Sequence, residues 1–213
     1  MYWLKKYSDT ILLLLLAFFV FPMAQIIMQY IPYNTDVAFL RIKQHYIGID
    51  IWRWAFFIHV YSSLLVLFAG FSQFNKRLLK SNPTLHRKLG YTYVVNILLI
   101  TGPASLIMGF YANGGIASRI SFVLLSLLWL FFTLKAVTDA QQKKIKSHQR
   151  FMIRSYALTL SAITLRAWKY GITNMLSIPP MDVYRIVAWL GWTVNLLVAE
   201  IYIRQVLNKK KIS

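Results

Sequence analysis

The chain has 213 residues, of which 24 are lysine or arginine and only 6 are aspartate or glutamate, so its formal charge is +18. Hydrophobic residues make up 58% and charged residues 14%, whereas about a quarter of a soluble domain is charged. These values exclude a disordered chain and an ordinary soluble enzyme, and the lack of cysteine excludes disulfides, cysteine-bound zinc and iron–sulfur clusters. The basic residues flank apolar runs, which is typical of a membrane protein and not of a nucleic-acid-binding face.

A membrane-spanning helix needs about 20 mostly apolar residues, and six windows of the sequence meet this requirement. The first follows Lys5 and Lys6, contains Pro22 as a kink, and is too long for a signal peptide. The sequence therefore predicts an all-α integral membrane protein, a six-transmembrane-helix bundle that forms a single domain over residues 1–213. The predicted helices span residues 9–29, 54–74, 89–111, 119–138, 151–171 and 184–206.

The connections between these helices predict the orientation of the bundle. If the N-terminus is inside, most lysines and arginines fall in the inner segments, so both termini are predicted to be cytoplasmic. The longest outer connection, residues 30–53, has room for a short helix at the membrane interface.

The four histidines are predicted to lie at different depths. His86 and His148 stand at the inner face, just before the third and fifth helices, while His59 lies inside the second helix and His45 in the outer connection. An imidazole within an apolar helix indicates a functional group, although a histidine hydrogen-bonded to a neighbouring helix explains His59 equally well.

The fifth predicted helix carries a polar stripe. At about 100° per residue, one face holds His148, Met152, Ser155, Thr159, Ala162 and Arg166, and this face is expected to point into the bundle. The second and third helices carry similar faces, although small and hydroxyl residues also serve close packing in any membrane bundle. The polar candidates on these faces are Ser155, Thr159, Arg166, Ser63, Gln73 and Tyr93.

Two arginines at depth need partners, because an unpaired guanidinium in the membrane costs about 3 kcal/mol or more. Glu200 is the expected partner of Arg154, and Asp50 or Asp182 could reach Arg166. A bound anion, such as a lipid phosphate or a haem propionate, would serve either arginine.

These residues together carry a family resemblance over about Ala55 to Arg166. The chain resembles the domain-of-unknown-function family 2306 (DUF2306), a family of predicted bacterial membrane proteins, and the resemblance implies a bacterial plasma membrane but no established activity. Tyr91 stands where the family has arginine. The matching positions are His59, the Gln73-Phe74 pair with Arg77, the run His86 to Gly90 with Tyr93, and the run His148 to Arg166.

The first functional hypothesis is a membrane redox protein similar to the two-haem b-type cytochromes, which hold haem between paired histidines. His86 and His148 share a depth on two helices, so they are the candidate iron ligands of an inner b-type haem. The candidate partners of its propionates are Arg87, Arg150 and Arg154. A second haem at His59 would need His45 or Met175 as its other ligand, and quinone is the expected electron-transfer partner.

Two alternatives remain open. One is a lipid- or anion-handling transporter or assembly factor, with a basic inner-face pocket for anionic lipid headgroups. The other is a cofactor-free membrane scaffold, in which the histidines cap helices; a zinc site of His86 and His148 alone has too few ligands. Enzymatic activity stays undecided, since no nucleophile has a base at a suitable spacing. The pocket of the first alternative consists of His86, Arg87, Lys88, His148, Arg150 and Arg154.

Overall fold

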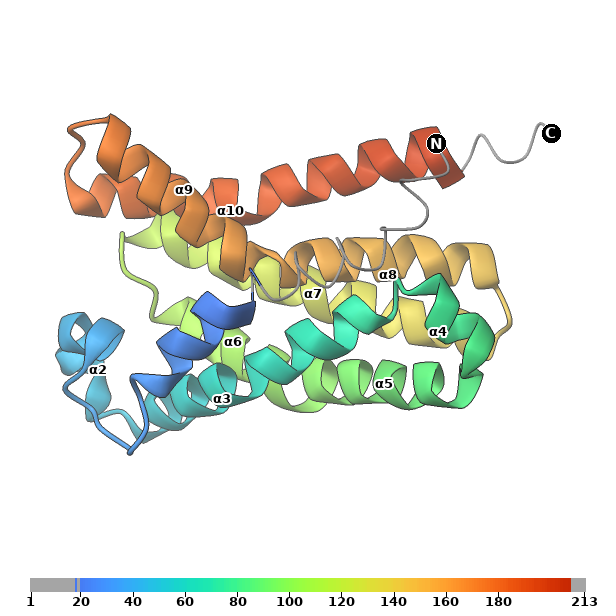
Figure 1. Ribbon diagram of the computed structural model, residues 1–213. Coiled ribbons are helices and arrows are strands. Elements are labelled where there is room, and N and C mark those ends of the chain that lie inside the picture. The colour runs from blue at the N-terminus through green and yellow to red at the C-terminus, as the bar shows by residue number, and fades with distance from the viewer. Residues whose placement is uncertain (1–17, 19, 208–213) are drawn as a thin grey trace.

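The computed structural model describes residues 18 and 20–207, and this part of the chain contains helices and no strands (Figure 1). Four of the described helical stretches are long and apolar enough to cross a membrane. They are Asp50–Ser72, Pro83–Phe110, Ile116–Gln141 and Pro180–Gln205. The membrane character expected from the hydropathy is therefore present, whereas the structure supports four spans and not the full set of six.

Three of the predicted spans match long helices with shifted ends. The second corresponds to α3 (Asp50–Ser72), the fourth to α7 (Ile116–Gln141) and the sixth to α10 (Pro180–Tyr202), which continues as the π-helical η3 (Ile203–Leu207). The predicted first span, residues 9–29, falls largely outside the described residues, and of it residues 20–28 are helical.

The third span is interrupted by a π-helical segment. It consists of α5 (Pro83–Val95), η2 (Asn96–Thr101) and α6 (Gly102–Phe110). Pro103 has no backbone N–H and its ring crowds the preceding turn, which explains the local widening of the helix. Gly102 is required there, since a Cβ atom would lie 2.3 Å from the carbonyl oxygen of Ile97 and 2.5 Å from Leu130 Cδ2.

The predicted fifth span is wrong as a single continuous helix. The structure has two helices of 15 residues, α8 (Ile145–Thr159) and α9 (Ser161–Met175), which meet at Leu160. The amide of Asn195 on α10 donates to the carbonyl of Ala157 at 3.0 Å, and it also donates to Thr164 Oγ1 at 3.0 Å. A side chain inserted among the helical hydrogen bonds is a recognised cause of a break.

Two ends of the bundle are distinguished by their connections (Figure 1). At one end, here called the α4 end, the short helix α4 (Lys76–Ser81) joins α3 to α5, and the turn after α7 leads into α8. At the other, the α2 end, the connection 30–53 contains a 3-10 helix η1 (Ala38–Lys43) and the short helix α2 (Gln44–Ile47). The short helix expected in that connection is thus confirmed.

The main core lies where α3, α5, α7, α8 and α10 meet. Its largest buried side chains include Tyr93, Trp129, Tyr156 and Trp192. Gly70 lets α3 approach this core, because a Cβ atom there would lie 2.6 Å from the ring of Tyr93 and 2.7 Å from that of Tyr156. The chain thus positions one aromatic and polar centre between its long helices.

Candidate functional site

The histidines predicted to pair, His86 and His148, are brought near each other at the α4 end. His148 Nδ1 lies 2.8 Å from the carbonyl oxygen of Ala136, so Nδ1 carries a proton and donates it to this carbonyl. His86 Nδ1 is buried and has no hydrogen-bond partner among the described residues. The two rings are close enough to interact electrostatically.

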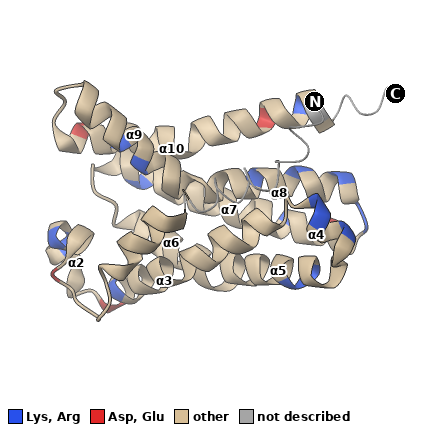
Figure 2. Ribbon diagram, viewed as in Figure 1, with Lys and Arg blue, Asp and Glu red and all other residues tan. Residues whose placement is uncertain are grey.

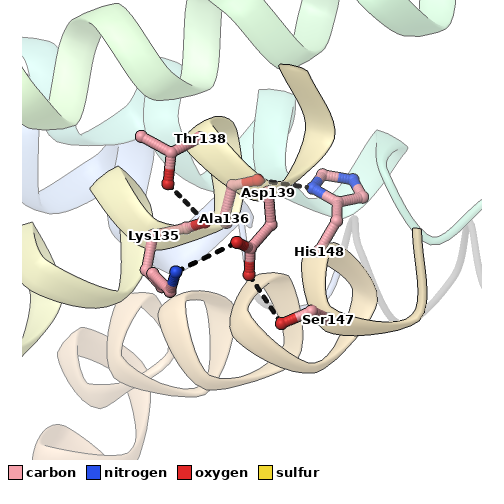
Figure 3. A network of polar contacts seen from close by, with 6 residues as sticks. All are labelled: Lys135, Ala136, Thr138, Asp139, Ser147 and His148. Carbon is pink, nitrogen blue, oxygen red and sulfur yellow. Dashed lines mark hydrogen bonds and ion pairs between the residues drawn. The ribbon is translucent and has the colours of Figure 1, made fainter. Parts of the chain in front are cut away.

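A buried carboxylate fixes the turn that leads to His148 (Figure 3). Asp139 is 1% exposed; its Oδ2 accepts a hydrogen bond of 2.6 Å from Ser147, and its Oδ1 lies 3.1 Å from Lys135 Nζ. The backbone N–H of Lys144 also donates to the Asp139 carbonyl at 2.8 Å. These contacts join the end of α7 to the start of α8, so they hold His148 against the carbonyl of Ala136.

Gln73 holds the other histidine-bearing helix. Its Nε2 atom donates to the carbonyl oxygen of His86 at 3.2 Å. Its Oε1 covers Gly90, where a Cβ atom would approach it to 2.9 Å. The predicted candidate Gln73 therefore links α3 to the first turns of α5, whereas Ser63 donates only to the carbonyl of Val60 in its own helix.

Three more of the predicted polar residues meet deeper in the bundle. Tyr93 lies seven residues after His86 on α5, and Ser155 lies seven residues after His148 on α8, so each pair shares a helix face. The Tyr93 hydroxyl lies 2.8 Å from Ser155 Oγ and 2.9 Å from Thr159 Oγ1. The histidines and these hydroxyls thus lie on the same faces of α5 and α8, and the hydroxyls join the two helices directly.

The hydroxyls form a closed ring with α7. Trp129 Nε1 donates to Thr159 at 3.0 Å, and Thr133 donates to the Trp129 carbonyl at 2.7 Å while lying 2.7 Å from Ser155 Oγ. Because each hydroxyl has one proton and Thr133 donates to a carbonyl, Ser155 donates to Thr133 and Tyr93 donates to Ser155. The Thr159 hydroxyl has two acceptors within reach, the Tyr93 oxygen at 2.9 Å and the Ser155 carbonyl at 3.2 Å. Each hydroxyl proton is used within the ring, which makes the ring a structural connection between three helices.

Trp129 and Thr133 were not predicted as part of this group. They lie four residues apart on one face of α7, a spacing visible in the sequence, but the uniformly apolar surroundings give no sign of which helix that face meets. Asp139 was also not predicted, although it is the carboxylate next to the basic connection between the fourth and fifth predicted helices.

The predicted partnership of Arg154 and Glu200 is confirmed. Arg154 Nε lies 2.5 Å from Glu200 Oε1 and its Nη2 lies 2.9 Å from Oε2, so the pair is bidentate and links α8 to α10. The guanidinium also lies 5.1 Å from the centroid of the Phe151 ring. Of the other two predicted candidates for a propionate, Arg87 is exposed and Arg150 is half-buried.

The expected partners of Arg166 are wrong. Asp50 pairs with Arg53 at 2.5 Å and Asp182 pairs with Arg185 at 2.7 Å, in each case three residues along the same helix. Arg166 donates instead to the Ala162 carbonyl at 2.5 Å, and both residues are exposed. Arg166 also lies within electrostatic range of Tyr30 and His59, beyond the break at Leu160.

His59 is not brought together with a second ligand. Its Nδ1 lies 3.4 Å from the carbonyl oxygen of Thr101, near the π-helical segment. His45 is exposed on α2 with its ring against Tyr46, and Met175 is 83% exposed at the end of α9. Among the described residues, no group of three or more histidines and carboxylates is placed to hold a metal ion.

The bundle and its sites define an α-helical integral membrane protein. Residues 56–203 match the model of a family described as predicted membrane protein (DUF2306), and the chain belongs to that family. No curated protein and no solved structure matches the chain.

Proposed function

We propose that this protein is a membrane redox protein that holds b-type haem at the α4 end, with His86 and His148 as the iron ligands. The observation that supports it is that His86 on α5 and His148 on α8 stand at the same end of the bundle, within electrostatic range of each other, with no group of three or more histidines and carboxylates placed to hold a metal ion among the described residues. A bare zinc or copper ion needs three or four protein ligands, whereas porphyrin supplies four nitrogens and leaves two positions for histidines.

The surroundings of His148 suit this role. A ligating histidine commonly donates its other ring N–H to a carbonyl, as His148 does to Ala136. The buried Nδ1 of His86 has no such partner among the described residues, so the proposal rests on the position of this ring and not on its hydrogen bonding. Arg87 and Arg150, which follow the histidines by one and two residues, are the candidates for the propionates.

Haem supplies one-electron transfer when bound, and quinone in the bilayer is the proposed electron partner. The protein's own residues hold and insulate the group. The ring of hydroxyls around Tyr93 closes the space between α5, α7 and α8, so the haem is confined to the α4 end, and the aromatic core around Trp129 separates it from the α2 end.

The orientation of the bundle is part of the proposal. The basic residues of α4, α5 and the α7–α8 turn gather at one end, which we assign to the cytoplasm of a bacterial cell (Figure 2). Because the chain has no cysteine, single cysteines at Lys143 and at His45 can be labelled selectively with a membrane-impermeant maleimide. The reagent should label position 45 and not position 143 in intact spheroplasts, and the reverse pattern would contradict this orientation.

The haem proposal is tested by the absorption spectrum of the detergent-purified protein, air-oxidised and then reduced with dithionite. We expect a Soret band and sharp reduced α and β bands that are lost in His86→Ala and in His148→Ala. His45→Ala is the matched control, because that ring is exposed on α2, and it should retain the bands. Haem-replete expression that yields a flat visible region, or bands that persist in both variants, would reject the assignment.

A further inference from the structure

The exposed charged residues described at the α4 end are all basic. Among the described residues there, α4, the start of α5 and the α7–α8 turn expose lysines and arginines but no carboxylate (Figure 2). The nearest carboxylates, Asp139 and Glu200, are paired with Lys135 and Arg154. Leaving out Arg87, which is assigned to the haem site, the exposed basic residues, here called the basic surface, are Lys76, Arg77, Lys80, Lys88, Lys143, Lys144 and Lys146.

Large apolar side chains are interspersed with these charges. Leu79 is 47% exposed on α4, Leu85 is 41% exposed on α5, and Ile145 is 55% exposed at the start of α8. A site for a soluble acidic partner would not need large apolar side chains exposed among its basic residues. At a membrane boundary, however, lysine and arginine reach the phosphates while neighbouring leucines enter the acyl region.

The local structure fixes the basic surface in place. The side chain of Asn75 caps α4 by accepting from the N–H groups of Arg77 and Leu78, and that of Asn82 caps α5 by accepting from Leu85. Lys76 and Lys80 are four residues apart and therefore share one face of α4. The charges stand on short, capped helices at the end of the spanning bundle.

We propose that the basic surface binds the headgroups of anionic phospholipids, at a site separate from the histidine pair. Clusters of four to eight basic residues next to a spanning helix attract anionic lipid, with a contribution from each charge near the surface. The ligand chemistry is a phosphodiester headgroup on a diacyl chain, and the apolar neighbours favour the lipid over a free phosphate. This inference does not depend on the haem proposal.

The test uses the full-length protein in a mild detergent and a native mass spectrometry titration. Dioleoyl phosphatidylglycerol is the anionic lipid, dioleoyl phosphatidylcholine the zwitterionic one, and glycerol phosphate the headgroup without chains. The triple variant Lys76→Gln/Lys80→Gln/Lys88→Gln should bind phosphatidylglycerol about a hundredfold more weakly, which is roughly fivefold for each charge. Phosphatidylcholine binding should not change.

Two matched variants control the experiment. Arg41→Gln/Lys169→Gln/Arg185→Gln removes the same charge from exposed residues outside the basic surface and should retain phosphatidylglycerol binding. Lys76→Arg/Lys80→Arg/Lys88→Arg keeps the charge and should bind like the wild type, which separates loss of charge from misfolding. Equal binding of both lipids by the wild type, an equal loss in the control triple, or equal binding of glycerol phosphate would each overturn the proposal.

Discussion

The phenol oxygen of Tyr93 lies 2.8 Å from Ser155 Oγ, so one hydrogen bond joins α5 to α8 in the middle of the bundle. Since Thr133 donates to the Trp129 carbonyl, Ser155 can only donate to Thr133 and must accept from Tyr93. This one constraint sets the direction of the hydrogen bonds from Tyr93 through Ser155 to Thr133. A substrate path along these hydroxyls would have to break the ring first.

Removing one member of the ring should destabilise the protein. Tyr93→Phe leaves Ser155 without its donor, and we expect the free energy of unfolding to fall by about 1–2 kcal/mol. The measurement is unfolding in mixed detergent with increasing dodecyl sulfate. Thr92→Val is the control, because the exposed Thr92 hydroxyl only donates to the Lys88 carbonyl in its own helix. An equal effect of both changes would show that the ring adds no stability.

The ion pair between α8 and α10 should be worth more than a surface pair. Arg154→Gln leaves Glu200, whose side chain is 30% exposed, without its bidentate partner, and we expect a loss of about 2 kcal/mol. Arg185→Gln breaks the pair with Asp182, whose side chains are 52% and 47% exposed, and should cost no more than about 0.5 kcal/mol.

A double-mutant cycle measures the interaction energy between Arg154 and Glu200 separately from the contribution that each residue makes alone. Arg154→Gln/Glu200→Gln should recover part of the loss, because neither charge then remains alone. Additive losses in the double variant would mean that the two residues act independently and that the pair does not stabilise α8 against α10.

The sequence predicts the long helices and the Arg154–Glu200 pair for clear reasons. Hydropathy alone marks α3, α7 and α10, and acids are so few that Arg154 has one reachable partner. The pairs Asp50–Arg53 and Asp182–Arg185 were also predictable, since a spacing of three residues joins them on one helix.

Other features depend on contacts between distant segments. The break at Leu160 lies beside Asn195, which comes from another helix, and nothing in residues 151–171 indicates it. The helical spacing of polar residues on α8 was enough to identify Ser155 and Thr159 as candidates. Their partners on α7, Trp129 and Thr133, depend on how the helices pack. A helical pattern predicts which residues share a face and leaves open which helix that face meets.

The break between α8 and α9 should depend on Asn195. In Asn195→Leu the Ala157 carbonyl loses its side-chain donor, so the backbone N–H of Ser161 can complete a continuous helix. Spin labels on cysteines at Gln149 and Tyr170 in the cysteine-free chain would report this by a longer distance in pulsed electron resonance. Asn174→Leu is the control, as Asn174 donates only to the Tyr170 carbonyl. Unchanged distances in Asn195→Leu would assign the break to another cause.

A buried lysine at the α2 end should make stability depend on pH. Lys43 is 2% exposed; its ammonium donates to the Tyr111 carbonyl and lies 4.6 Å from the centroid of the Tyr46 ring. Burial, and to a lesser extent the charge of Arg119, lowers the pKa of Lys43 from 10.5 to about 8. Between these two values the unfolded chain binds the proton that the folded protein releases.

The free energy of unfolding should therefore rise with pH between about 8 and 10.5, by at most about 3 kcal/mol. Melting temperatures of the wild type and of Lys43→Met, measured side by side from pH 7 to pH 10, isolate this contribution from other titrating groups. The wild type should gain stability relative to Lys43→Met as the pH increases. A constant difference across this range would mean that Lys43 keeps its ordinary pKa and that its ammonium is stabilised by the surrounding rings as fully as by water.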